Sequence, residues 1–149
     1  MTGLDVTAQV RVDVGCPRAF ARFTDGLGDW WPREYTWSQA RLEAIGIEDG
    51  MCFERGPHGF RCHWGRVLAW EPPSRLVFSW QISPARVPEP DPDRASEVEV
   101  VFAGDGEGTL VSLSHTGFER HGEGAEGYAE AMGSEMGWPY ILERYRSMT

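Results

Sequence analysis

Apolar and polar residues alternate along the first segment of the chain. Five apolar residues, Val6, Ala8, Val10, Val12 and Val14, are separated by single residues that are mostly polar. Because the side chains of a strand point alternately to its two faces, this period of two is typical of a strand with one buried face. We therefore expect residues 6–14 to form a strand that packs against a core.

The spacing changes after Pro17, a residue that suits the first turn of a helix. Phe20, Phe23 and Leu27 recur at intervals of three and four residues, which places them on one face of a helix. Glycines at positions 26 and 28 interrupt this pattern. The segment therefore predicts two short helices that end near residues 30–32.

Four runs rich in β-branched and aromatic residues then predict strands at 41–47, 51–55, 60–70 and 76–82. The last two runs are separated by Pro72 and Pro73, which cannot sit inside a hydrogen-bonded ladder and so predict a corner. Pairing Glu71 with Ser74 across this corner would place Val67 opposite Phe78 and Gly65 opposite Trp80. A glycine opposite an indole leaves room for the ring, so we expect a concave sheet with a tryptophan in its hollow.

Residues 83–95 contain four prolines and five charged residues and predict a long loop. Strands are expected at 97–102 and 109–115, joined by a glycine-rich hairpin turn at 104–108. The last segment has helical spacing from Tyr128 to Tyr145, with a kink or restart near Gly137 because Pro139 lacks a backbone N–H.

Strands joined by short turns favour an antiparallel sheet, and an amphipathic helix long enough to cross it completes a second layer. The expected fold class is therefore α+β: a curved antiparallel sheet of about six to seven strands, two short helices and a long C-terminal helix packed across the sheet. No internal repeat or boundary divides the 149 residues, so residues 1–149 are interpreted as one domain.

Composition excludes several classes of function. The chain has 14 basic and 23 acidic residues and a net charge of −9, which opposes binding to a phosphate backbone, so no nucleic acid partner is expected. No apolar run reaches the ~20 residues of a membrane span and the N-terminus lacks a signal-peptide pattern, so we expect a cytoplasmic protein. Three cysteines without a C-x-x-C spacing predict reduced thiols.

Five segments together resemble a known family. They are FARFTDGLGDWWP at 20–32, WGRVLAWEPPSRLVFSW at 64–80, SEVEVVF at 96–102, GTLVSLSHTGFE at 108–119 and GWPYILERY at 137–145. These segments and their order resemble those of the START-like (SRPBCC, helix-grip or Bet v-like) superfamily. Within it, they are most similar to the branch named for the activator of heat-shock protein 90 ATPase homologue. The resemblance implies a cavity between the curved sheet and the long helix. It chooses no single function, since such proteins include lipid carriers, hormone receptors, polyketide cyclases and chaperone regulators.

Aromatic side chains are the main candidates for binding a ligand, because small-molecule pockets are commonly lined by them. For Trp80, Tyr128 and Met132, core packing and cavity lining both remain open. The residues expected at a ligand-binding cavity are His63, Trp64, Phe78, Trp80, His115, Tyr128, Met132 and Trp138. Arg61 and Arg75 are candidates to pair with a ligand carboxylate.

Two histidines fall on faces that point inward. His115 follows Val111 and Leu113 on one strand face and is a weak candidate for a catalytic base, the alternative being a hydrogen-bonded structural histidine. His63 is interpreted either as a pocket residue or as a residue of the rim. The cysteines and histidines near residues 52–63 match no zinc spacing, and common nucleophile and phosphate-loop motifs are absent, so no metal or cofactor is expected.

Three functions follow from these features. The first is non-catalytic binding of a small, mostly apolar molecule, which makes the chain more a binding protein than an enzyme. The second is an enzyme, similar to a polyketide cyclase, that uses the same pocket. The third is regulation of a chaperone ATPase through a protein interface, with acidic residues such as Glu126 and Glu130 as candidates to steer a basic partner, or simply to stabilise a helix N-terminus.

Overall fold

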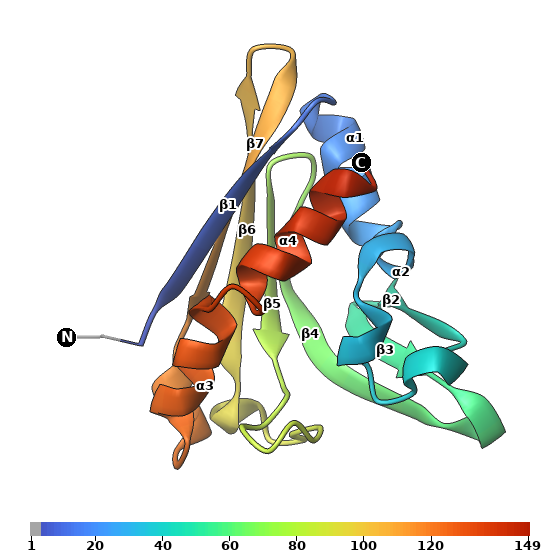
Figure 1. Ribbon diagram of the computed structural model, residues 1–149, viewed down its shortest axis with the longest axis vertical. Helices are drawn as coiled ribbons and strands as arrows, with labels where there is room; N and C mark the ends of the chain where they lie inside the picture. The colour runs from blue at the N-terminus through green and yellow to red at the C-terminus, as the bar shows by residue number, and fades with distance from the viewer. Residues whose placement is uncertain (1–3) are drawn as a thin grey trace.

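A computed structural model describes residues 4–149 and contains one antiparallel sheet of seven strands. The strands lie in the order β1-β7-β6-β5-β4-β3-β2. Their bounds are β1 Val6–Val12, β2 Ala44–Glu48, β3 Met51–Arg55, β4 Arg61–Glu71, β5 Arg75–Trp80, β6 Ser96–Asp105 and β7 Gly108–Thr116. Figure 1 shows the sheet with the helices on one of its faces. The expected α+β fold, with its curved sheet and C-terminal helix, is confirmed.

Four α-helices accompany the sheet: α1 Cys16–Thr24, α2 Leu27–Trp30, α3 Ala125–Gly133 and α4 Trp138–Ser147. Short 3-10 turns lie at η1 Arg33–Tyr35, η2 Gln39–Arg41, η3 Pro57–Gly59, η4 Pro92–Arg94 and η5 Phe118–His121. The expected strand at 41–47 begins only at Ala44, because Arg41 ends η2 and residues 42–43 connect the two elements. No helix among residues 4–149 is long and apolar enough to cross a membrane.

The C-terminal helix is divided into α3 and α4, as the sequence suggested. A Cβ atom at Gly137 would lie 2.2 Å from the carbonyl oxygen of Met132, so only glycine lets the chain turn back this tightly between the two helices. Pro139 then occupies the first turn of α4, where its missing N–H costs no hydrogen bond. The restart predicted near Gly137 is therefore confirmed, and α4 crosses the sheet in Figure 1.

Two β-bulges bend the sheet, one in the β3–β4 pair at Cys52/Phe53 and one in the β4–β5 pair between Val67 and Ala69. Val67 pairs with Phe78 as predicted. The predicted Glu71–Ser74 pair is wrong: Glu71 pairs with Arg75, and the bulge shifts the ladder by one residue before it reaches Val67.

The predicted pairing of Gly65 with Trp80 is also absent from the ladder. Gly65 pairs instead with Cys52 of β3, and a Cβ atom on Gly65 would lie 2.4 Å from the carbonyl oxygen of Ser79. The glycine therefore allows two backbones to approach, rather than making room for an indole. β4 bends at this point and brings Trp64, which is 1% exposed, into the interior.

The core lies between the sheet and α1, α2 and α4. Phe23 of α1 packs edge-on against Phe102 of β6 and Tyr145 of α4, with ring centroids 5.7 and 5.1 Å apart. The hydroxyl of Tyr145 donates a hydrogen bond to the carbonyl oxygen of Ala19 at 2.8 Å. These contacts fill one end of the space under α4 with side chains, whereas the other end, under α3, contains a cavity.

Candidate functional site

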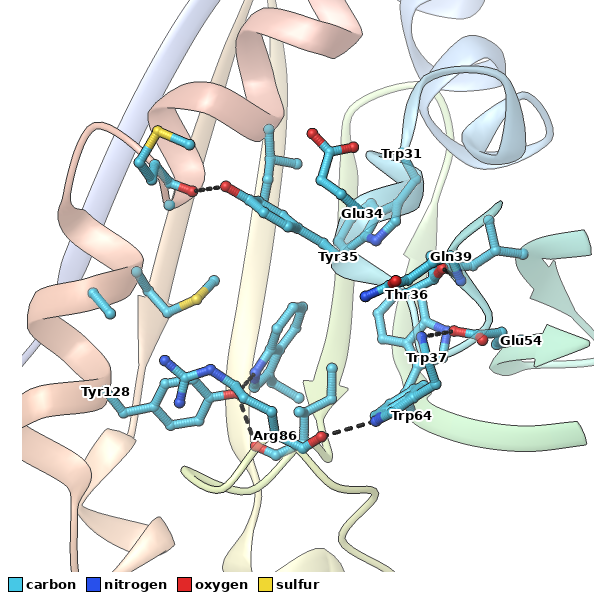
Figure 2. Close-up of a pocket in the computed structure, with 18 of the residues that line it drawn as sticks. Trp31, Glu34, Tyr35, Thr36, Trp37, Gln39, Glu54, Trp64, Arg86 and Tyr128 are labelled. Atoms are coloured by element: carbon cyan, nitrogen blue, oxygen red, sulfur yellow. Dashed lines mark hydrogen bonds between the residues drawn. The ribbon is translucent and has the colours of Figure 1, made fainter. Parts of the chain in front are cut away.

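A cavity of about 570 Å³ lies between the sheet, α3, the segment at residues 31–39 and the loop after β5. Its volume falls within the roughly 300–1,000 Å³ common for small-molecule pockets. The lining residues are Trp31, Glu34, Tyr35, Thr36, Trp37, Gln39, Ile45, Glu54, Trp64, Trp80, Ile82, Arg86, Tyr128, Ala131, Met132, Ser134, Met136, Gly137 and Ile141. Figure 2 shows most of them as sticks.

Three tryptophans form the inner wall of the cavity. Trp31 lies partly stacked on Trp64, with ring centroids 5.3 Å apart and planes inclined by 33°. Trp80 packs edge-on against Trp64 at 5.7 Å, and its ring centroid lies 6.3 Å from that of Trp31. Such broad apolar surfaces favour a flat aromatic ligand, because offset stacking and edge contacts are the preferred geometries between rings.

The polar atoms of these indoles have different partners. The Nε1–H of Trp80 donates a hydrogen bond to the hydroxyl of Tyr128 at 2.6 Å, and that hydroxyl donates to the carbonyl oxygen of Ile82 at 3.0 Å. Burial raises the pKa of Tyr128 to about 12, so the phenol keeps the proton that it donates. The Nε1–H of Trp64, in contrast, is buried without a hydrogen-bond partner, and no other side-chain N or O atom that the structure describes is in this state.

One carboxylate lies inside the cavity wall. Glu54 of β3 is fully buried, and its two oxygens accept hydrogen bonds from the backbone N–H groups of Trp37 at 3.1 Å and Ser38 at 2.8 Å. Glu54 thus fixes the segment at residues 31–39 to the sheet. Hydrogen bonds from N–H donors are the compensation that a buried carboxylate requires.

Two hydrogen bonds span the mouth of the cavity, both visible in Figure 2. The hydroxyl of Tyr35 donates to the carbonyl oxygen of Met136 at 2.6 Å, and the Nε1–H of Trp37 donates to the carbonyl oxygen of Arg86 at 2.8 Å. Also at the mouth, Glu34 accepts a hydrogen bond from Tyr140 at 2.6 Å, which lowers the pKa of this carboxyl group.

His115 lies outside the cavity lining and belongs to a separate buried network. The Nε1–H of Trp138 donates to its Nδ1 at 2.9 Å, and its Nε2 lies 2.7 Å from the hydroxyl of Ser96. Because an indole can only donate, His115 carries its proton on Nε2 and donates to Ser96, whose hydroxyl then donates to Nε2 of His121 at 2.8 Å. Burial, followed by the nearby His121, lowers the pKa of His115 to about 3.

The residues expected at the cavity fall into three groups: some line it, some are buried behind the lining, and one is exposed. Trp64, Trp80, Tyr128 and Met132 line it. Phe78, Trp138 and His115 are buried behind the lining, with Phe78 edge-on to Trp64 and Trp138 edge-on to Trp80. His63 is exposed on β4. Of the two candidate arginines, Arg75 pairs with Glu71 and Glu99, and Arg61 lies over the ring of Phe53; neither lines the cavity.

Sequence reasoning did not select Trp37, Glu54 or Arg86, which the loops and β3 bring to the cavity. Trp31, which also lines the cavity, follows Trp30 and precedes Pro32 at the end of the second predicted short helix. Among residues 4–149, no group of three or more His, Cys, Asp or Glu side chains is placed to hold a metal ion.

Comparisons with known proteins agree with this architecture. Residues 17–148 match the family model described as activator of Hsp90 ATPase homolog 1-like protein. No curated protein matches the chain. Among solved structures, an anthrahydroquino-gamma-pyrone synthase, Txn09, is 34% identical, with a TM-score of 0.68 over 97% of this chain and 96% of that one.

Two further structures widen the comparison. The self-sacrificing resistance protein CalC from Micromonospora echinospora is 27% identical, with a TM-score of 0.65 over 97% of this chain and 92% of CalC. The Aha1 dimer from Colwellia psychrerythraea, at 11% identity and a TM-score of 0.62 over 96% of this chain and 93% of that one, shares the fold alone. Since the family model covers most of the chain and agrees with the resemblance seen in the sequence, the chain belongs to the activator of Hsp90 ATPase homolog 1-like family.

Proposed function

We propose that the chain binds a small, mostly apolar and planar molecule in the cavity between the sheet and α3. The observation that carries this proposal is the cavity wall of Trp31, Trp64 and Trp80, which leaves about 570 Å³ open in the interior. A packed core would fill such a space, because unfilled apolar volume reduces stability. The buried and unpartnered N–H of Trp64 supports a ligand with a hydrogen-bond acceptor, since an unsatisfied donor costs about 1–3 kcal/mol.

The name of one relative above 25% identity supports a polycyclic aromatic ligand. Txn09 is named as a synthase of an anthrahydroquino-gamma-pyrone, and CalC as a resistance protein. A three-ring or four-ring aromatic molecule matches the flat surfaces of the tryptophans. The likeness to Aha1 adds no argument for a chaperone partner, because at 11% identity it concerns the fold.

The test is a binding screen with planar aromatic molecules of two to four rings, read by intrinsic tryptophan fluorescence and by thermal shift. We expect saturable binding with a Kd below ~10 μM, which corresponds to a binding free energy of about 7 kcal/mol in favour of the complex. Ala131→Phe, which places a ring in the cavity, is expected to abolish binding, whereas the matched change Ala103→Phe at an exposed position of β6 leaves it intact. A folded wild-type protein that binds no member of the panel would refute the proposal.

A second candidate function is catalysis of a reaction on such a ligand, and the 34% identity to a synthase favours it. His115 does not serve as its base, because the imidazole lies outside the cavity lining, where Trp138 and Ser96 engage it. Glu54 is the buried carboxylate of the cavity and the group best placed for proton transfer.

The test of this second function is incubation with the substrate of Txn09. General acid–base groups contribute roughly 10² to 10⁴ in rate, so Glu54→Gln should reduce turnover by at least 10²-fold. Equal turnover by the folded Glu54→Gln variant would exclude Glu54 as the base. Ligand binding without any turnover would exclude catalysis of this reaction and support the binding function only.

A further inference from the structure

Arg86 lies in the loop between β5 and β6 and, among residues 4–149, is the one cationic residue in the lining of the cavity. Its guanidinium carbon lies 4.3 Å from the ring centroid of Tyr128, a cation–π distance. In Figure 2 the two side chains lie together, away from Glu34 and Glu54. The cavity therefore has one end with a positive charge.

The backbone of Arg86 is held in a conformation that arginine rarely adopts. Its φ of 65° is in the left-handed region, which costs free energy for a residue with a Cβ atom. Two hydrogen bonds maintain it: the N–H of Arg86 donates to the carbonyl oxygen of Ser83 at 2.8 Å, and its carbonyl oxygen accepts from Nε1 of Trp37 at 2.8 Å. Strain of this kind is typical of ligand clamps, where the surrounding structure fixes one residue.

The aromatic platform beneath the guanidinium is fixed as well. The hydroxyl of Tyr128 accepts from Trp80 and donates to Ile82, so the ring cannot turn away without breaking both hydrogen bonds. The cation and its platform are thus held in place by contacts that need no ligand. A site organised in advance binds with a smaller loss of entropy.

The guanidinium of Arg86 donates a hydrogen bond to the carbonyl oxygen of Pro84, but no carboxylate of the described chain neutralises its charge. Among residues 4–149, the ion pairs involve seven other arginines, and none joins Arg86 to a carboxylate. Both carboxylates of the cavity already accept hydrogen bonds, Glu34 from Tyr140, and Glu54 from the backbone of Trp37 and Ser38. In a protein with a net charge of −9, an anionic ligand requires such a local cation.

We infer that the ligand is a planar aromatic acid, whose rings lie against the tryptophan wall and whose carboxylate binds the guanidinium of Arg86. This inference rests on the proposed binding function and adds the chemical class of the ligand. Arginine and carboxylate form charge-assisted hydrogen bonds, frequently in pairs, which suit recognition of one end of a flat molecule.

The experiment compares anthraquinone-2-carboxylate with anthraquinone-2-carboxamide, a pair of similar shape that differs in charge. The panel also includes two-ring and four-ring acids with their amides. Affinities are measured by tryptophan fluorescence for wild type, Arg86→Gln, Arg86→Lys and Arg18→Gln. Arg18 is exposed on α1 outside the cavity, so its replacement changes the net charge equally without touching the site.

We expect wild type to bind the acids at least tenfold more tightly than the amides. Arg86→Gln should weaken acid binding at least tenfold and amide binding less than twofold, Arg86→Lys should fall between, and Arg18→Gln should match wild type. Equal binding of acids and amides by wild type, or equal effects of Arg86→Gln on both, would overturn the inference and leave the binding function standing. Binding of neither series would overturn both.

Discussion

Trp64 and Trp138 are both buried indoles, with 1% and 0% of their surface exposed, but their N–H groups differ in environment. Trp138 donates to His115 and begins a network in which every member has a partner. Trp64 lies at the cavity and its N–H donates to no group of the described chain. The comparison separates a region that is complete by itself from one that a ligand would complete.

The same contrast appears in the packing of the two regions. Around His115, rings pack closely, with the centroid of Phe118 only 4.0 Å from that of the imidazole. Around Trp64, the aromatic wall faces open volume. Buried polar groups stabilise a protein when each is satisfied and destabilise it when one is left without a partner. We therefore expect changes in the histidine network to affect folding, and changes at Trp64 to affect binding.

Lowering the pH is the change from which we expect the largest effect on the histidine network. His115 has a folded-state pKa of about 3, and that of His121 is also lowered, mainly by burial, whereas an unfolded histidine titrates near 6.5. Below pH 6.5 these histidines bind protons in the unfolded chain but stay neutral in the folded protein. The free energy of unfolding therefore falls as the pH drops from 6.5 toward 3. Because a tenfold change in a protonation equilibrium corresponds to about 1.4 kcal/mol, we expect the free energy of unfolding to fall by several kcal/mol over this pH range.

The measurement is urea unfolding between pH 7.5 and 4 for wild type and His115→Gln. The difference between the two curves removes the contribution of the carboxylates common to both proteins. We expect the variant to lose less stability on acidification. Parallel curves would mean that His115 does not govern the acid response.

His115→Ala should produce the next largest effect. The change removes the acceptor of Trp138 and the donor to Ser96, and it leaves a cavity beside Phe118. We expect a loss of about 3 kcal/mol in the free energy of unfolding. His63→Ala, at an exposed position, is the control and should change stability by less than about 0.5 kcal/mol. A loss below about 1 kcal/mol for His115→Ala would show that the network adds little.

The two indoles can also be compared directly by changing each to phenylalanine. Both changes remove similar volume, but only Trp138→Phe breaks a hydrogen bond and leaves Nδ1 of His115 without its donor. We expect Trp138→Phe to destabilise the protein by about 1–2 kcal/mol more than Trp64→Phe, as measured by urea unfolding at pH 7.5. Equal losses would remove the distinction between the two regions.

The smallest expected effect concerns ligand affinity. If the N–H of Trp64 donates to a ring carbonyl, Trp64→Phe should weaken binding of anthraquinone-2-carboxylate about fivefold, close to 1 kcal/mol. Anthracene-2-carboxylate, which lacks ring carbonyls, should lose less affinity, because only the stacking surface of the indole is reduced for this ligand. Isothermal titration calorimetry distinguishes the two ligands. An equal change for both would assign the role of Trp64 to stacking alone.

Much of the fold was predictable because it depends on local patterns. The alternation at the N-terminus gave β1, and the glycine and proline near residue 138 gave the break between α3 and α4. Trp80, Tyr128 and Met132 were expected between sheet and helix, with core packing and cavity lining both open, and all three line the cavity. The predicted register at the proline corner was wrong because a β-bulge has no clear signature in the sequence.

The rest of the cavity depends on loops whose direction a sequence pattern does not specify. Arg86 reaches the cavity through a left-handed backbone conformation and a hydrogen bond from Trp37, 49 residues earlier in the chain. Glu54 is buried because two backbone N–H groups from another segment reach it. Polar residues of this kind resemble solvated surface residues until their partners are known.

The two hydrogen bonds across the mouth have a consequence for the rates of binding. Tyr35 and Trp37 join the segment at residues 31–39 to Met136 and Arg86, while two tryptophans of the wall, Trp64 and Trp80, lie on the sheet. We expect a ligand that passes between these segments to break these bonds on the way in and on the way out. Residence time in the cavity then depends on these two hydrogen bonds, whereas the preference for a flat ligand depends on the tryptophan wall, so the two properties can change independently during evolution.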